Sequence, residues 1–119
     1  PAAWAKLYQE YLGVEVPNDR EGCLQDSHWS GGSFGYFPSY ALGNAYGAQM
    51  LHNMEQEFDV FGQVARGNLS GVTGWLREHV HQYGQLLEPA AIVKNACGEF
   101  DPHYYLDYLT RKYTELYNL

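Results

Sequence analysis

The sequence predicts an all-α protein: a single bundle of four or five helices with a long irregular connection. Apolar residues recur every three or four positions in several separate segments, which is the spacing of amphipathic helices. No segment of useful length alternates apolar and polar residues with period two, as a half-buried strand would. A chain of 119 residues has room for one domain with a modest core. We therefore expect residues 1–119 to form a single helical domain.

The first two predicted helices lie on either side of the irregular connection. The first occupies residues 1–12 and ends at Gly13, and its apolar face carries Trp4, Leu7, Tyr8 and Tyr11. The second begins at Pro38 and continues for about twenty residues, since proline suits a first helical turn. Its predicted apolar stripe consists of Phe37, Ala41, Asn44, Ala48, Leu51, Met54 and Phe58. Gly43 and Gly47 would let another helix or a substrate backbone approach this helix closely.

The remaining helices follow from capping signals and apolar spacing. One is expected to be capped by Ser70 and closed by Gly84. A short helix is expected over residues 89–97. In the last helix Asp101 is the predicted N-cap and Pro102 the first helical residue.

Composition limits the classes of partner and compartment. The formal net charge is −7, which disfavours nucleic acid and anionic membranes as partners. Cys23 and Cys97 are far apart and form no Cys-x-x-Cys motif, so we expect two reduced thiols in a cytoplasmic protein. The sequence contains no apolar run of transmembrane length and no secretory leader.

The connection before the second long helix carries the densest set of polar and aromatic side chains. Gln25, Asp26, His28 and Trp29 fall within five residues, and glycines and tyrosines follow, in the order Gly31-Gly32-Ser33-Phe34-Gly35-Tyr36-Phe37-Pro38-Ser39-Tyr40. Glycine there indicates a backbone with positive φ or close approach to another group. One interpretation is a polar turn whose side chains satisfy backbone groups between helices.

Three motifs resemble those of the M32 family of metallocarboxypeptidases, the thermostable carboxypeptidase 1 group. They are Gly22-x-x-Gln25-Asp26-x-His28-Trp29, the segment from Gly35 to Asn44, and the tail Ala96-Cys97-Gly98-Glu99 with Tyr105-Leu106-x-Tyr108-Leu109-x-x-Lys112-Tyr113. Members of that family carry a His-Glu-x-x-His zinc helix upstream, and this sequence contains no His-Glu-x-x-His. The resemblance therefore implies the C-terminal quarter of such an enzyme, separated from its metal ligands.

The resemblance also implies roles for the central motif. His28 would donate a hydrogen bond to an oxyanion or to the substrate carboxylate, and Asp26 would orient an imidazole. Gln25 and Trp29 would fix the loop at the substrate, and Tyr36 and Tyr40 would present hydroxyls. The implied substrate is a peptide with a free C-terminus. The intact enzyme would use zinc or another divalent metal and form a homodimer, whereas this chain would hold no metal and show no peptidase activity by itself.

Other interpretations of the same residues remain open or are disfavoured. In a non-catalytic helical interaction module, the same side chains would only stabilise the helical core. Gly31–Gly35 lacks the Gly-Lys-Ser/Thr ending of a phosphate-binding loop, and Ser33 lacks the surroundings of a hydrolase nucleophile. His79 and His81 are two apart, so on a helix they point in different directions and are not expected to share a metal. We expect exposed aromatic side chains around the central motif, Phe34, Tyr36 and Phe37 among them.

Overall fold

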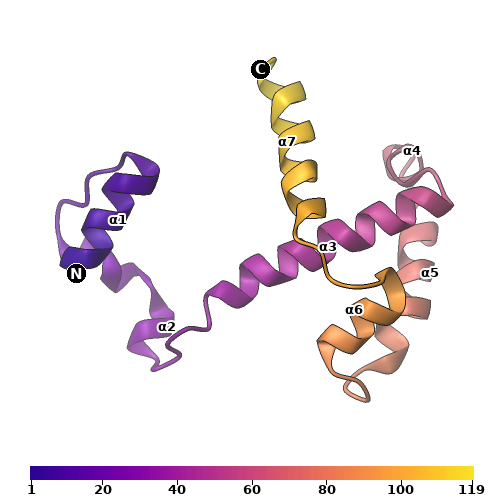
Figure 1. The fold of residues 1–119 in the computed structure, drawn as a ribbon, viewed down its shortest axis with the longest axis horizontal. Coiled ribbons are helices and arrows are strands. Elements are labelled where there is room, and N and C mark those ends of the chain that lie inside the picture. The colour runs from indigo at the N-terminus through magenta and orange to yellow at the C-terminus, as the bar shows by residue number, and fades with distance from the viewer. The chain divides into compact units, whose positions relative to one another are not determined.

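A computed structural model describes all 119 residues, and every regular element in it is helical (Figure 1). The α-helices are α1 Ala2–Leu12, α2 Ser27–Ser30, α3 Pro38–Glu57, α4 Val60–Ala65, α5 Ser70–His79, α6 Pro89–Cys97 and α7 His103–Tyr117. Three 3₁₀ turns are interspersed, η1 Asp19–Glu21, η2 Cys23–Gln25 and η3 His81–Tyr83. The all-α prediction is confirmed. The helices exceed the predicted four or five because α2 and α4 are too short to show apolar periodicity.

The chain divides into two compact units, residues 1–39 and residues 40–119. The first unit contains α1, η1, η2 and α2. Trp4 of α1 stacks on Tyr8 with ring centroids 5.1 Å apart and meets Trp29 of α2 edge-on at 5.4 Å. These aromatic contacts hold α2 against α1 within the unit.

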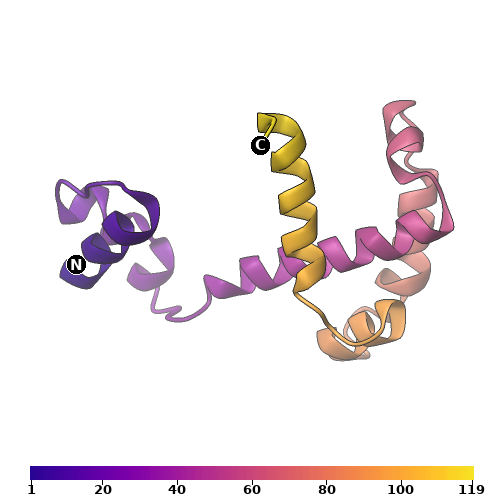
Figure 2. The same ribbon diagram turned by 45° about the horizontal axis from the view of Figure 1, so that its top comes forward.

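The second unit has its core at the C-terminal end of α3, where α4, α5 and α6 gather (Figures 1 and 2). Met54, Val60 and Trp75 are its buried centre. The indole Nε1–H of Trp75 donates to Glu57 Oε1 at 2.8 Å, so the ring buries its surface without losing its hydrogen bond. The side chains packed around this centre are Met50, Leu51, Phe58, Val72, Leu76, Val80, Ala96 and Cys97.

Only part of the apolar stripe predicted for α3 is covered. Leu51, Met54 and Phe58 reach the core, whereas Phe37, Ala41 and Asn44 are exposed. A Cβ atom built on Gly43 or Gly47 would meet no atom within 4 Å beyond the helix's own backbone. Each of these glycines costs about 1 kcal/mol relative to alanine in a helix interior, and no contact within this chain offsets that cost.

Gln49 ties the middle of α3 to the connection between α6 and α7. The residue is only 1% exposed. Its amide nitrogen donates to the carbonyl oxygens of Cys97 at 3.2 Å and Glu99 at 2.9 Å, and its Oε1 accepts from the Asp101 N–H at 3.0 Å. One buried amide therefore satisfies three backbone groups that no helix pairs.

The predicted helix ends are confirmed where glycine turns the chain. Gly13 has φ 65° after α1, and Gly98 has φ 82° after α6, both in the region that side chains disfavour. The helix predicted to reach Gly84 instead ends at His79, and the separate 3₁₀ turn η3 follows it.

Two capping predictions have different outcomes. Asp101 Oδ1 accepts from the His103 N–H at 2.9 Å, as expected of a cap, but α7 begins at His103, one residue after the predicted Pro102. The prediction that Ser70 caps its helix is wrong, because Ser70 is the first residue of α5. Asn68 takes the capping role instead, and its Oδ1 accepts from the Ser70 N–H at 3.0 Å. None of the helices is both long and apolar enough to span a bilayer.

Candidate functional site

The central motif folds as two short helical turns, η2 and α2, joined at Asp26. Asp26 is buried, at 8% exposure, and its Oδ1 accepts from the backbone N–H of His28 at 3.0 Å. Aspartate is a favoured N-cap because its carboxylate satisfies a first-turn N–H group and complements the helix dipole. Asp26 is therefore the cap of α2, an arrangement that agrees with the interpretation of this segment as a polar turn.

The same carboxylate oxygen also holds the His28 ring. Nδ1 of His28 lies 2.6 Å from Asp26 Oδ1, a short contact typical of a charge-assisted hydrogen bond. With the carboxylate as acceptor, Nδ1 carries the proton, and Nε2 is the ring nitrogen turned away from Asp26. The pair fixes both the tautomer and the orientation of the imidazole.

Aromatic rings from the glycine-rich segment surround the imidazole. The His28 ring centroid lies 5.5 Å from that of Tyr36 and 5.2 Å from that of Phe37, which it meets edge-on. Phe34 lies against Trp29 at 6.4 Å. Phe34 is 75% exposed and Tyr36 54% exposed, and Phe37 is similarly exposed, which confirms the expected aromatic surface around the motif.

The other predicted site residues have different surroundings. Gln25 is exposed and its Nε2 donates to the Arg20 carbonyl oxygen at 2.6 Å, so it ties η2 to η1. Trp29 contacts Trp4 and is partly exposed. Tyr40 lies in the first turn of α3, opens the second unit, and has an exposed ring.

The chain offers no donor set for a metal ion. No three His, Cys, Asp or Glu side chains come together in a group that could ligate one. His79 is half-buried, with its ring stacked on Trp75 at 4.3 Å, whereas His81 is exposed. The two histidines thus have the separate environments expected from their spacing.

One contribution was not visible in the sequence. Gly22 is buried between Val16 and Trp4, and a Cβ there would lie 2.5 Å from Val16 Cγ1 and 3.2 Å from the Asn18 carbonyl oxygen. Glycine is therefore required for the chain to enter η2 at this place. The sequence showed a glycine at the start of the motif, but it did not show that Val16 lies too close to Gly22 for a side chain.

Comparison with known proteins gives consistent similarities over nearly the whole chain. The sequence model described as "Carboxypeptidase Taq (M32) metallopeptidase" matches residues 1–113. Carboxypeptidase 1 of Bacillus subtilis is 46% identical over 100% of this chain and 24% of its own length. Thermostable carboxypeptidase 1 of Thermus thermophilus is 40% identical over 98% of this chain and 23% of its own.

Solved structures agree with the sequence matches. The M32 carboxypeptidase of Deinococcus radiodurans superposes with a TM-score of 0.90 and 35% identity, covering 99% of this chain and 24% of that one. Metallocarboxypeptidase 1 of Trypanosoma cruzi gives a TM-score of 0.89 at 38% identity, over 95% and 24%. The chain thus spans about a quarter of the length of the relatives it matches.

Proposed function

Because this chain belongs to the M32 family of metallopeptidases, we propose that it forms the C-terminal part of a carboxypeptidase that releases C-terminal amino acids from peptides. Its own contribution is to bind and orient the substrate. One observation carries the proposal: the buried Asp26 holds the His28 ring in one orientation beside an exposed aromatic surface. Asp101 and His103 make the same two contacts at the start of α7, but their side chains are 49% and 76% exposed, whereas those of Asp26 and His28 are 5% and 22% exposed.

The chemistry of the substrate suits this arrangement. A carboxypeptidase must bind a free carboxylate and stabilise the negative charge that develops on the carbonyl oxygen. The His28 ring, held through Nδ1 by Asp26, turns Nε2 toward the substrate, and Nε2 donates to either of these oxygens when a proton is bound there. Because the ring is already oriented, little reorganisation accompanies the reaction.

The surrounding side chains complete the binding surface in this proposal. Trp29 and Tyr36 provide flat apolar walls for the substrate side chain, and the Tyr36 hydroxyl provides a further donor. Tyr40, in the second unit, keeps only the role that the family resemblance implies. Gln25 acts indirectly, since its hydrogen bond to Arg20 fixes the turn that precedes Asp26. His28 and Asp26 are the groups to which we assign the catalytic contribution.

The metal must be held elsewhere. The family implies a divalent metal in the intact enzyme, and we propose zinc, but the residues of this chain do not fit as its ligands. Asp26 and His28 bond to each other, and they belong to no group of three His, Cys, Asp or Glu side chains. We therefore assign to them hydrogen bonding to the substrate and not metal binding, and we assign the metal ligands to residues outside this chain.

The compartment and the assembly are further parts of the proposal. Free Cys23 and Cys97 suit a reducing, cytoplasmic environment. The resemblance to the family supports a homodimer of the intact enzyme.

A chimera provides the test. This chain would replace the matching quarter of Bacillus subtilis carboxypeptidase 1, and release of the C-terminal residue from an N-blocked peptide would be followed. We expect His28→Ala to lower kcat about a hundredfold, corresponding to roughly 3 kcal/mol of transition-state stabilisation, with little change in melting temperature. His81→Ala, at an exposed histidine of η3, is the matched control and should leave kcat unchanged.

The opposite result would identify a structural residue. If His28→Ala lowers the melting temperature by several degrees while the folded protein turns over normally, the site is a polar turn and the chain a structural module. Tyr36→Phe removes only a hydroxyl. If that hydroxyl binds the substrate equally strongly in the ground state and the transition state, its loss raises KM and leaves kcat unchanged.

A further inference from the structure

A groove runs between α3 and α7 in the second unit. Its floor is the Gly43, Gly47 and Leu51 row of α3, spaced by four residues. Residues of α7 form the opposite wall, and the cavity between α3 and α7 measures about 430 Å³. The α7 residues lining it are Tyr105, Tyr108, Leu109, Lys112 and Tyr113.

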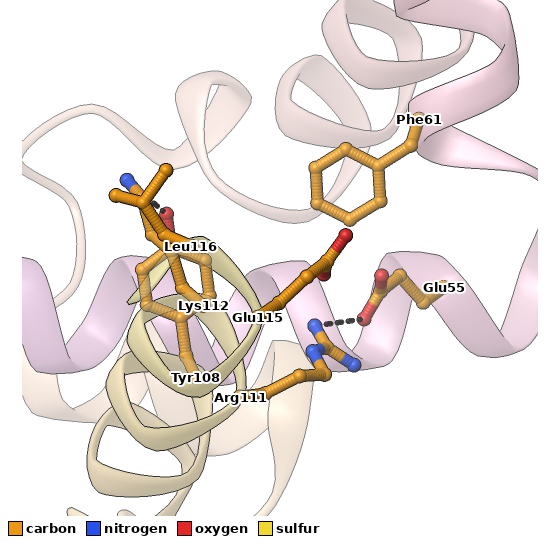
Figure 3. A pocket seen from close by; sticks show the side chains of 7 residues that line it. All are labelled: Glu55, Phe61, Tyr108, Arg111, Lys112, Glu115 and Leu116. Carbon is orange, nitrogen blue, oxygen red and sulfur yellow. Dashed lines mark hydrogen bonds and ion pairs between the residues drawn. The ribbon is translucent and has the colours of Figure 1, made fainter. Parts of the chain in front are cut away.

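A second cavity of about 730 Å³ also adjoins α7 and shares Tyr108 and Lys112 with the first (Figure 3). Phe61 of α4 points into it, and Arg111 bridges to Glu55 of α3 with 3.7 Å between nitrogen and oxygen. This ion pair and the hydrogen bonds of Gln49 tether α7 to α3, but neither closes the space beside the helix.

The α7 helix lacks the packing that its sequence calls for. It has fifteen residues and none of them is buried. Leu106, Tyr113 and Leu116 are spaced seven and three residues apart, which places them on one apolar face, and they are 55%, 42% and 60% exposed. Isolated helices of this length are marginal in water, and helical stability in proteins comes mainly from covering the apolar face. The apolar face of α7 therefore needs a partner that this chain does not supply.

The glycines of α3 point to the same missing contact. After proline, glycine is the least favourable residue in a helix interior, and it is useful where another backbone must come close. Gly43 and Gly47 have open space where a Cβ would stand. Two such residues one turn apart, facing a groove, are suited to the close approach of a second segment.

We propose that the α3–α7 groove docks the remainder of an M32 polypeptide, through an apolar segment that packs on Gly43 and Gly47 and covers α7. The argument for this occupant is the length of the relatives, three quarters of which this chain does not match. A second copy of this chain is disfavoured as the occupant because each copy carries a net charge of −7. The proposal rests on family membership and not on the role of His28.

The test compares one double variant in two contexts. In the isolated chain, Gly43→Leu with Gly47→Leu should raise the melting temperature by a few degrees, because leucine favours a helix and its side chain enters open space. In the Bacillus subtilis chimera, the same changes should lower the melting temperature by several degrees, because the docked segment occupies that space. Gly74→Leu in α5, where a Cβ also meets no atom, should act alike in both contexts.

Each other outcome would overturn the proposal. A rise in both contexts would mean that the groove stays open, and a fall in both would mean that the chain fills it alone. An unmodified chimera that fails to fold would mean that these faces do not fit the rest of the polypeptide. A dimer of the isolated chain that the leucine variant dissolves would make a second copy the occupant.

Amide exchange supplies an independent measurement. Residues 103–117 should exchange quickly in the isolated chain and become protected in the chimera. Equal exchange in the two proteins would contradict the docking of α7.

Discussion

Gln49→Met keeps the unbranched shape of a buried side chain and removes all of its hydrogen bonds. The change leaves the Cys97 and Glu99 carbonyl oxygens and the Asp101 N–H without their partner. A typical intramolecular hydrogen bond contributes about 1 kcal/mol net, and a buried group left unpaired costs more. Glu99 is exposed, so water can replace one partner. We expect a loss of about 2–4 kcal/mol.

For a unit of this size, such a loss corresponds to a fall in melting temperature of about 10 °C or more. Thermal and urea unfolding of the chain would measure it, and the Asp101 amide should lose its protection from hydrogen exchange. Gln56→Met makes the same chemical change at an exposed position of α3 and should alter stability by less than about 0.5 kcal/mol. If the two variants lose equal stability, or if the Asp101 amide stays protected, Gln49 does not join α3 to the connection between α6 and α7 as described.

Three further predictions concern the motif and a thiol. Asp26→Ala should destabilise the chain by about 1 kcal/mol more than Asp26→Asn in urea unfolding, because asparagine keeps an oxygen to cap α2 at the His28 N–H; equal losses would argue against the cap. Gly22→Ala should cost roughly 1–3 kcal/mol through its clash with Val16, and Val16→Ala should recover part of that loss if the clash is the cause. Burial raises the pKa of Cys97, so its stabilisation is present below the unfolded thiol pKa and is lost as pH rises through the higher folded value. Its alkylation by iodoacetamide at pH 8 should be slower than that of free cysteine and should reach the free rate in urea, as followed by mass spectrometry.

The parts of the fold that the sequence predicted are those with local causes. Gly13 and Gly98 end helices because each takes a positive φ, and Asp101 caps α7 through a neighbouring N–H. The helix expected to reach Gly84 stops at His79, since periodicity continues through the 3₁₀ turn that follows. The short α2 has too few residues for any period to show.

The parts that it could not predict depend on distant residues. Gln49 is polar and belongs to no stripe, so its three partners around fifty residues away left no trace in the local pattern. The spacing of apolar residues in α3 shows which face is apolar, but it does not show which residues cover that face. Ala41 belongs to the predicted stripe and is nevertheless exposed. At the site, the spacing of Asp26 and His28 made their pairing possible, and only the coordinates show that one oxygen serves both the cap and the ring.

That double use of Asp26 Oδ1 has a consequence for the order in which the protein assembles. The pair spans two residues, so the chain loses little entropy in closing it, and a turn of this size forms within about a microsecond. The contacts of Gln49 span 48 to 52 residues and must wait for α6 and the start of α7 to arrive. The orientation of the His28 ring is thus set as soon as the first turn of α2 closes, before any long-range packing exists. A short peptide over residues 22–31 should already show the bond from Nδ1 to the carboxylate in its NMR spectrum.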